Sequence, residues 1–294
     1  MIVPGRAHLG HIMRYVGRPL AVLFAWDVIV TAGYMGLAQH WIEFPALPLT
    51  LLGSAVAVYL TFRNNAAYAR WWEGRILWGS MVNYSRSFAR EAKILLARGH
   101  EDLGRTLIHR HIAYVHALRL HLRRQVPWEE LSPRLPADEI ERLKQVANVP
   151  NAILDRSAAM LAEHGELDSI RLAAVESTMT ALSNAQGGME RIKNTPLPQQ
   201  YATYTVLFTH AFCILLPLGM VESLGFYTPL GSTAAGFLFL ALLQTGNDIQ
   251  NPFENSEHDV PLTTITRSIE IDLRDGLGEK HGLKGFAAEK DVLW

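Results

Sequence analysis

Two long stretches of the sequence lack any Lys or Arg, at residues 19–62 and 194–266. They cover 44 and 73 residues of a 294-residue chain. Soluble helices carry charge at shorter intervals, so we interpret the gaps as membrane-embedded segments, with buried core segments as the alternative. The whole chain has 27 basic and 28 acidic residues, so no basic excess indicates a nucleic-acid partner.

Motifs for catalysis and metal binding are also scarce. The single cysteine, Cys213, lies in an apolar run, which excludes a disulfide scaffold. The sequence contains no His-Glu-x-x-His, no phosphate-binding glycine loop and no Glu-x-x-His pair, so we expect no enzyme and no catalytic residues. No segment alternates with the period of a strand, which predicts an all-α protein. We expect the histidines of the middle segment to be surface or inter-subunit groups: His100, His109, His111, His116 and His121.

Both charge-free stretches contain apolar runs close to the roughly 20 residues that cross a bilayer. The four candidate transmembrane helices are Leu20–Gln39, Leu47–Phe62, Tyr204–Leu224 and Tyr227–Gly246. The short loops within each pair carry no Lys or Arg, so the positive-inside rule places both termini and the middle segment in the cytoplasm of a multi-pass protein. The predicted organisation is a cytosolic arm at 1–18, a transmembrane hairpin at 19–75, a cytosolic helical domain at 76–200, a second hairpin at 201–247, and a cytosolic motif, helix and tail at 248–294.

The first apolar run contains one acid, Asp27. A charged side chain in the membrane costs about 2.5–3.5 kcal/mol on insertion scales, so Asp27 should face protein or water. It would act either as a hydrogen bonder between helices or as a charge beside an aqueous vestibule. A secretory signal is the competing interpretation of this N-terminus, but Asp27 argues against it, and cleavage would leave three spans.

The stretch Leu49–Trp78 organises the chain, because it has no proline and passes from an apolar half into a half rich in Arg and Trp. One helix could therefore run through the bilayer and out into water. Ser54, Val58 and Phe62 are four residues apart and form one row on that helix. Our hypothesis is that several copies of this row form the neck of an ion pore; lipid- or core-facing side chains are the alternative. An interfacial belt should follow, formed by Arg63, Arg70, Trp71, Trp72, Arg75 and Trp78.

Acidic residues suggest two further sites. Glu43 and Glu222 fall in the two external loops, where they would form either an anionic pore mouth or ordinary solvated loop acids. A turn near the C-terminus groups several oxygen ligands, either as a Ca²⁺ site or as a plain acidic turn. Its members are Asn251, Glu254, Glu257 and Asp259.

Several short motifs together resemble the bestrophin family, in its bacterial branch, over about residues 19–278. They are Phe62-Arg63-Asn64, Tyr68-x-Arg70, Trp78-Gly79, Gly187-Gly188-x-Glu190-Arg191, Thr195-Pro196-x-Pro198 and Asn251-Pro252-Phe253 with Asp259. The resemblance implies a homopentameric channel for monovalent ions in the bacterial inner membrane, with four membrane helices and a cytosolic helical body. Animal relatives conduct chloride and bacterial relatives conduct cations, so the sign of the ion stays open.

The resemblance also assigns residues. It places the neck at Ser54, Val58 and Phe62 and a second, cytosolic constriction at Ile170. Ser54 replaces a bulkier apolar residue of the family, which should make the neck easier to wet. The acidic turn corresponds to the calcium clasp of animal members, but Ser256 stands where they have an acid, so we do not expect Ca²⁺ gating and expect no other cofactor. A membrane-anchored signalling or scaffold protein without a pore is the alternative function.

Overall fold

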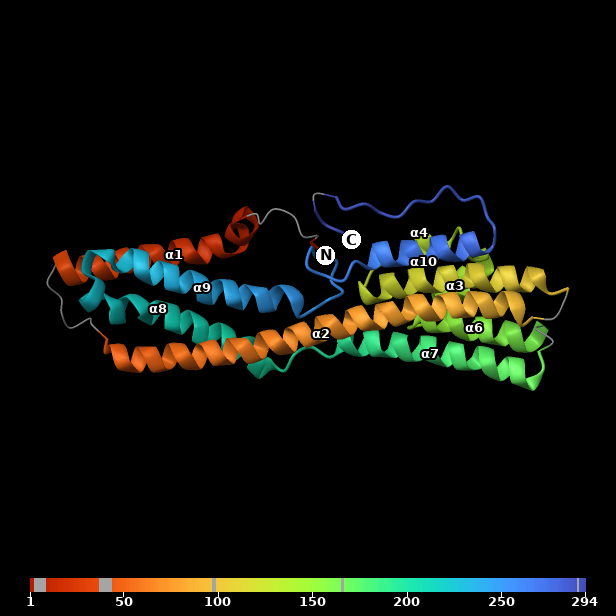
Figure 1. Ribbon diagram of the computed structural model, residues 1–294, viewed down its shortest axis with the longest axis horizontal. Helices are drawn as coiled ribbons and strands as arrows, with labels where there is room; N and C mark the ends of the chain where they lie inside the picture. Colours follow the sequence, from red (N-terminus) through yellow and green to blue (C-terminus); the bar gives the residue numbers. More distant parts are fainter. Residues whose placement is uncertain (3–8, 37–43, 97–98, 165–166, 290) are drawn as a thin grey trace. The chain divides into compact units, whose positions relative to one another are not determined.

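The computed structural model describes residues 1–2, 9–36, 44–96, 99–164, 167–289 and 291–294 (Figure 1). The chain divides into two compact units. The span unit comprises Pro4–Trp71 and Pro196–Asn251, and the body unit comprises Met1–Val3, Trp72–Thr195 and Pro252–Trp294. Apart from two isolated bridges near the chain ends, every regular element in the described residues is helical, which confirms the predicted all-α class.

Helices of the span unit cover the four apolar stretches that the sequence marked as candidate membrane helices. They are α1 (Leu9–Gly36), the first part of α2 (Ala46–Ile94), α8 (Thr205–Leu224) and α9 (Thr228–Ile249). Helix α1 starts at Leu9, inside the region predicted as an arm, and continues through Pro19. Within the described residues, three stretches are long and apolar enough to cross a membrane: Val16–Gly36, Ala46–Ile94 and Gln200–Ile249. The last contains both α8 and α9, which the 3-10 turn Gly225–Tyr227 separates.

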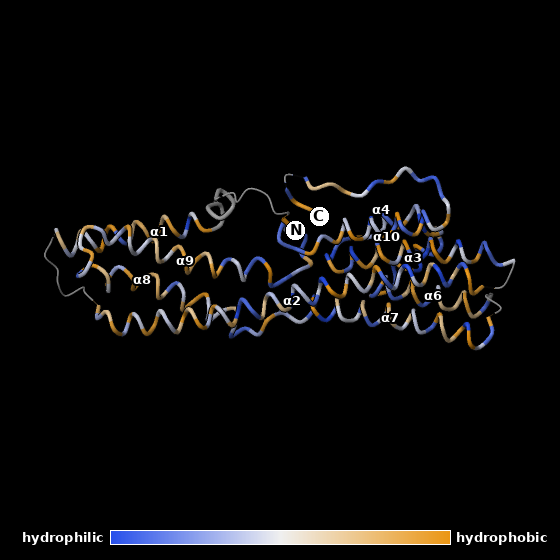
Figure 2. Tube along the Cα trace, in the orientation of Figure 1, coloured by the Kyte–Doolittle hydropathy of each residue, from blue (hydrophilic) through white to orange (hydrophobic). Residues whose placement is uncertain are grey.

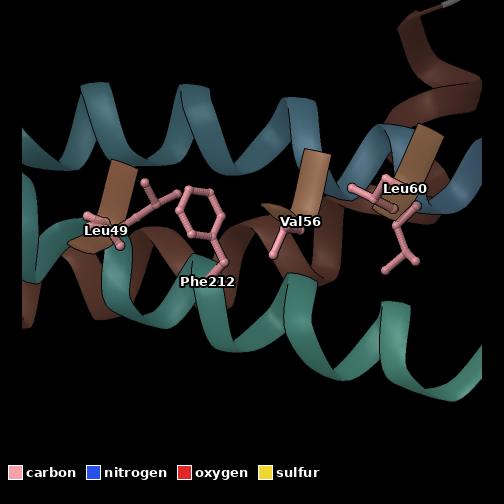
Figure 3. Packing of buried hydrophobic residues seen from close by; sticks show 6 residues of the cluster. Leu49, Val56, Leu60 and Phe212 are labelled. Atoms are coloured by element: carbon pink, nitrogen blue, oxygen red, sulfur yellow. The ribbon is translucent and has the colours of Figure 1, made fainter. Parts of the chain in front are cut away.

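One face of α2 packs into the core of the span unit. Figure 3 shows the Phe212 ring of α8 beside Leu49 of α2, with Val56 and Leu60 further along α2. Leu216 and Leu243 complete this buried cluster. A Cβ on Gly53 would lie 2.7 Å from the Phe212 ring, so glycine lets that ring approach the α2 backbone. Among apolar helices, such close contacts stabilise through dispersion rather than through transfer from water.

Asp27 joins α1 to α9. Its carboxylate is fully buried and accepts hydrogen bonds from Ser232 Oγ at 3.0 Å and Thr233 Oγ1 at 2.7 Å. One turn further, a Cβ on Gly236 would lie 2.2 Å from a Leu23 methyl, so glycine permits the close approach of the two helices. Of the two roles expected for Asp27, the structure supports hydrogen bonding between helices.

The body unit is built around α3 (Glu101–Leu122), which is buried over most of its length. Helix α3 contacts α4 (Trp128–Leu131), α6 (Val149–His164), α7 (Ser169–Asn194) and α10 (Leu262–Gly276). The short helix α5 (Ala137–Leu143) lies between α4 and α6 in the sequence. Figure 2 shows more hydrophilic residues along these helices than along α1 and α8. The sequence predicted a helical domain at 76–200 without resolving the single turn α4. Pro136 precedes α5 as its cap residue.

The prediction that the middle histidines are surface or inter-subunit groups is wrong for two of them, which are buried within the chain itself. His111 is buried between the rings of Phe88 and Tyr114, and its Nε2 lies 2.8 Å from Ser85 Oγ. Burial lowers the pKa of His111 to about 3, so this ring is neutral. The apolar period of α3 continues through both histidines, so their position on the buried face outweighs their polarity.

The second buried histidine, His116, bridges two carboxylates. Its Nδ1 lies 3.0 Å from Glu130 and its Nε2 lies 3.0 Å from Glu270. The hydrogen bond from His116, together with Arg119, lowers the pKa of Glu130 to about 2. Burial alone would raise the pKa of Glu270, but His116 and the neighbouring Arg134 and Arg267 outweigh it and hold this pKa at about 2.

The two lowered pKa values predict an acid-sensitive body. A carboxylate whose pKa is lower in the folded state stabilises the fold above its ordinary pKa of 4.5, and this contribution is lost as the pH falls towards 2. We expect the urea concentration at the midpoint of unfolding, followed by circular dichroism, to decrease as the pH is lowered from about 5 to about 3. Glu130→Gln should flatten this dependence. An unchanged slope in Glu130→Gln would contradict the role given to His116.

Candidate pore site

The predicted neck residues lie on the uncovered face of α2. Val58 is 55% exposed and Phe62 is 60% exposed, and Ser54 is exposed as well. Residues two apart on an α-helix differ by a rotation of about 200°. Val56 follows Ser54 by two residues and Leu60 follows Val58 by two, so both lie on the opposite side of α2 from the row. Both are buried against α8 and α9. The packing therefore turns the row away from the rest of the span unit.

Polar residues share this uncovered face with Val58 and Phe62. Thr50, Ser54 and Thr61 are exposed, and each hydroxyl donates to the carbonyl four residues earlier, at 2.9 Å. Such bonds satisfy the hydroxyl within its own helix and leave a short, mildly polar surface. A face meant only for lipid has no need of three hydroxyls, whereas a face along a water-filled passage tolerates them.

Arg63 fixes the orientation of α2 beside the neck. Only 1% of its surface is exposed. Its guanidinium donates to the Leu243 carbonyl at 3.1 Å, to Asn247 Oδ1 at 2.5 Å and to Gln250 Oε1 at 3.2 Å, all on or just beyond α9. All three acceptors are neutral. Because Phe62 is the preceding residue, this set of bonds resists any rotation of α2 that would bury the Phe62 ring.

This position of Arg63 corrects the predicted interfacial belt. Arg63 and Trp78 are both buried, so neither lies at a membrane surface. Trp72, in contrast, is 49% exposed, as a belt residue should be. A dense run of Arg and Trp has the composition of a belt, but the helix turns every third or fourth residue towards its own packed neighbours.

Ile170, the predicted cytosolic constriction, is on the first turn of α7 and is 82% exposed. Asp168 caps this helix, and its carboxylate accepts from the backbone N–H groups of Ile170 at 3.0 Å and Arg171 at 2.9 Å. The cap fixes the backbone that carries Ile170. A large aliphatic side chain is therefore presented on an ordered helix end within the body unit.

The structure describes only one of the two acids proposed for a pore mouth. Glu222 is exposed near the end of α8. Glu43 lies outside the described residues. The described part of the chain therefore provides one of the two acids, and the choice between an anionic mouth and ordinary loop acids stays a prediction.

Residues of the acidic turn have separate partners. Glu254 pairs with Lys193 Nζ at 2.9 Å, and Asp259 is buried and accepts a hydrogen bond from the Ser256 hydroxyl. Asn251 is exposed at the end of the span unit. Among the described residues, no three His, Cys, Asp or Glu side chains are placed to share a metal ion. Whether Ca²⁺ binds this turn stays an open prediction.

Comparison with known proteins identifies the family. The family model for Bacterial/Fungal Bestrophin protein matches residues 6–275. This chain is a bestrophin. A voltage-dependent anion channel-forming protein of Ralstonia nicotianae is 37% identical over 256 residues, 83% of each chain. One of the same description from Escherichia coli K12 is 32% identical over 267 residues, 90% of this chain and 87% of that protein.

The fold of this bestrophin is also similar to a solved structure. A bacterial bestrophin homolog from Klebsiella pneumoniae superposes with a TM-score of 0.84 at 28% identity, over 89% of this chain and 98% of that one. The resemblance found in the sequence motifs is therefore confirmed along most of the chain. Arg63 and Asn64 belong to one of these motifs, but the motif did not indicate which residues of α9 they bind.

Proposed function

We propose that this bestrophin is a homopentameric channel that conducts monovalent ions across a membrane, with four membrane helices per subunit. The observation that carries the proposal is the uncovered row Ser54, Val58 and Phe62 on a helix whose opposite face is packed. One helix cannot enclose a passage, so the row lines a pore only when copies of α2 face each other. Helices α8 and α9 have 20 and 22 residues, so each is long enough to cross the bilayer separately.

The neck acts as a barrier to water. A ring of Phe62 side chains with Val58 above it is apolar and narrow, and such constrictions gate by dewetting. Ser54 weakens the barrier on one side, because its hydroxyl can bind water when the ring is hydrated. Ile170 forms the second constriction, in the cytosolic body.

The sign of the ion follows from groups outside the neck, because Ser54, Val58 and Phe62 carry no charge. The relatives are named as anion channel-forming proteins. The resemblance to bacterial bestrophins favours cations instead. The proposal is therefore a monovalent-ion channel, whose selectivity is set at the mouths.

Reconstitution of the purified protein in a planar bilayer under asymmetric NaCl tests this function. Channel currents support the proposal, and the sign of the reversal potential gives the ion. Intact oligomers without current would contradict it and favour a membrane-anchored scaffold. The mass of the detergent-solubilised particle, measured by light scattering, tests the pentamer separately, because a monomer cannot enclose a pore.

A further inference from the structure

Asn65 lies on the uncovered face of α2, three residues beyond Phe62, and its side chain is exposed. It follows Val58 by seven residues, a rotation of about 700° along an α-helix, so the two side chains point within roughly 20° of each other. It follows Ser54 by eleven residues, which brings it back to within roughly 20° again. The motif that contains Phe62 ends one residue earlier, at Asn64. Asn65 therefore continues the row of neck residues, although the resemblance gave it no role.

The two residues before Asn65 fix the direction of its side chain. Arg63 binds acceptors on α9, and Asn64 Nδ2 donates to the Leu242 carbonyl of the same helix at 2.8 Å. A Cβ on Gly246 would lie 2.2 Å from Asn64 Oδ1 and 2.6 Å from Arg63 Nη1, so glycine makes room for both side chains. Because Asn65 follows Arg63 by two residues, a rotation of about 200°, it points away from α9.

The amide of Asn65 keeps its full capacity for hydrogen bonds. Within the described part of the chain, its side chain makes no hydrogen bond to another residue. The hydroxyls of Ser54 and Thr61 differ, because each donates to a carbonyl of its own helix at 2.9 Å. An amide offers a carbonyl acceptor and two N–H donors. Asn65 is therefore the group of this row that is best able to bind a solute.

The position of Asn65 along α2 places it directly beside the apolar part of the row. An α-helix rises by 1.5 Å per residue, so Asn65 follows Phe62 by about 4.5 Å along the axis. Ser54 and Asn65 are about 16 Å apart on the same scale, with Val58 and Phe62 between them. The apolar side chains are thus flanked by a polar group at each end. An ion that passes a narrow apolar ring loses part of its water shell, and the next polar group can replace it.

We propose that Asn65 amides, one from each subunit, form a binding site for the permeant monovalent ion next to the Phe62 ring. The amide carbonyl faces a cation and the amide N–H groups face an anion, so the site replaces lost water for an ion of either sign. This inference rests on the proposed function, because the amides face each other only if copies of α2 surround a pore. It adds a binding group that the neck residues Ser54, Val58 and Phe62 do not supply.

Single-channel recording of the full chain in a planar bilayer, with NaCl as the only salt, tests the site. Asn65→Leu removes the amide at nearly constant size and should lower the conductance roughly threefold to tenfold, the range expected for one lost hydrogen bond. Asn65→Gln keeps the amide and should retain most of the current. Asn65→Asp places a ring of carboxylates at the site, so under asymmetric NaCl the reversal potential should move towards the sodium equilibrium potential. The matched controls are Asn194→Leu and Asn194→Asp, at an exposed amide that ends α7.

The outcomes separate this site from the channel itself. If the unmodified protein conducts and the Asn65 variants behave like the Asn194 variants, the amide site is overturned and the channel stands. If the unmodified protein passes no current, the proposed function fails, and this site fails with it. Should Asn65→Leu not assemble, which light scattering shows, Asn65→Asp decides, because a carboxylate has the size of the amide. An unchanged reversal potential in Asn65→Asp would then overturn the site.

Discussion

Replacing Phe62 with alanine is expected to raise the single-channel conductance or the open probability roughly tenfold, which corresponds to a barrier about 1.4 kcal/mol lower. The reason is geometric. The Phe62 ring projects from the uncovered face of α2, so its removal from every subunit should widen the proposed neck and ease its wetting. Single-channel recording in a planar bilayer measures the change.

Phe226→Ala provides the matched control for this experiment. Phe226 is 78% exposed in the turn between α8 and α9, so the substitution removes the same ring from the same unit away from the neck. We expect its currents to match those of the unmodified channel. If Phe62→Ala and Phe226→Ala behave alike, the ring at position 62 does not limit the current.

The second large effect concerns the stability of the body. Glu139→Ala should lower its free energy of unfolding by about 3–5 kcal/mol, because it leaves the Arg110 guanidinium buried without its carboxylate. The side chains of this pair are only 6% and 8% exposed. Urea unfolding followed by circular dichroism measures the loss as a lower transition midpoint.

The neighbouring residue supplies the control. Asp138→Ala removes a carboxylate from a pair whose side chains are 69% and 71% exposed, and exposed pairs contribute roughly 0–1 kcal/mol. A similar loss for Asp138→Ala and Glu139→Ala would show that burial of the Arg110 pair contributes little. Arg110→Met with Glu139→Leu should recover part of the stability, because no charge is then left buried.

The sequence predicted most helices because their signals are local. The absence of proline from Leu49 to Trp78 predicted one continuous helix, and α2 is indeed unbroken from Ala46 to Ile94. Helix α4 was missed because a single turn after Pro127 is too short to show a period.

Side-chain partners could not be predicted, because they come from distant parts of the chain. Asp27 binds Ser232 and Thr233 on α9, and Arg63 binds Asn247 on the same helix. Composition alone placed Arg63 at a membrane surface, because the composition of a run of Arg and Trp does not show which of its side chains are buried.

The neck assignment has a different origin. Spacing alone allows many rows on α2, and the choice of Ser54, Val58 and Phe62 came from the resemblance to bestrophins. The structure adds that this row is uncovered while Val56 and Leu60 are buried. The exposed row supports the proposed pore, and the pore itself is a property of the assembly.

Cysteine accessibility at position 62 measures most directly whether this row lines a conduit. Cys213 is the only native cysteine and is buried, so Cys213→Ala gives a background without thiols. In that background, a charged methanethiosulfonate reagent should block the current of Phe62→Cys and leave Leu60→Cys, on the packed face, unaffected. Currents of Phe62→Cys that persist after complete labelling would contradict a pore lined by α2.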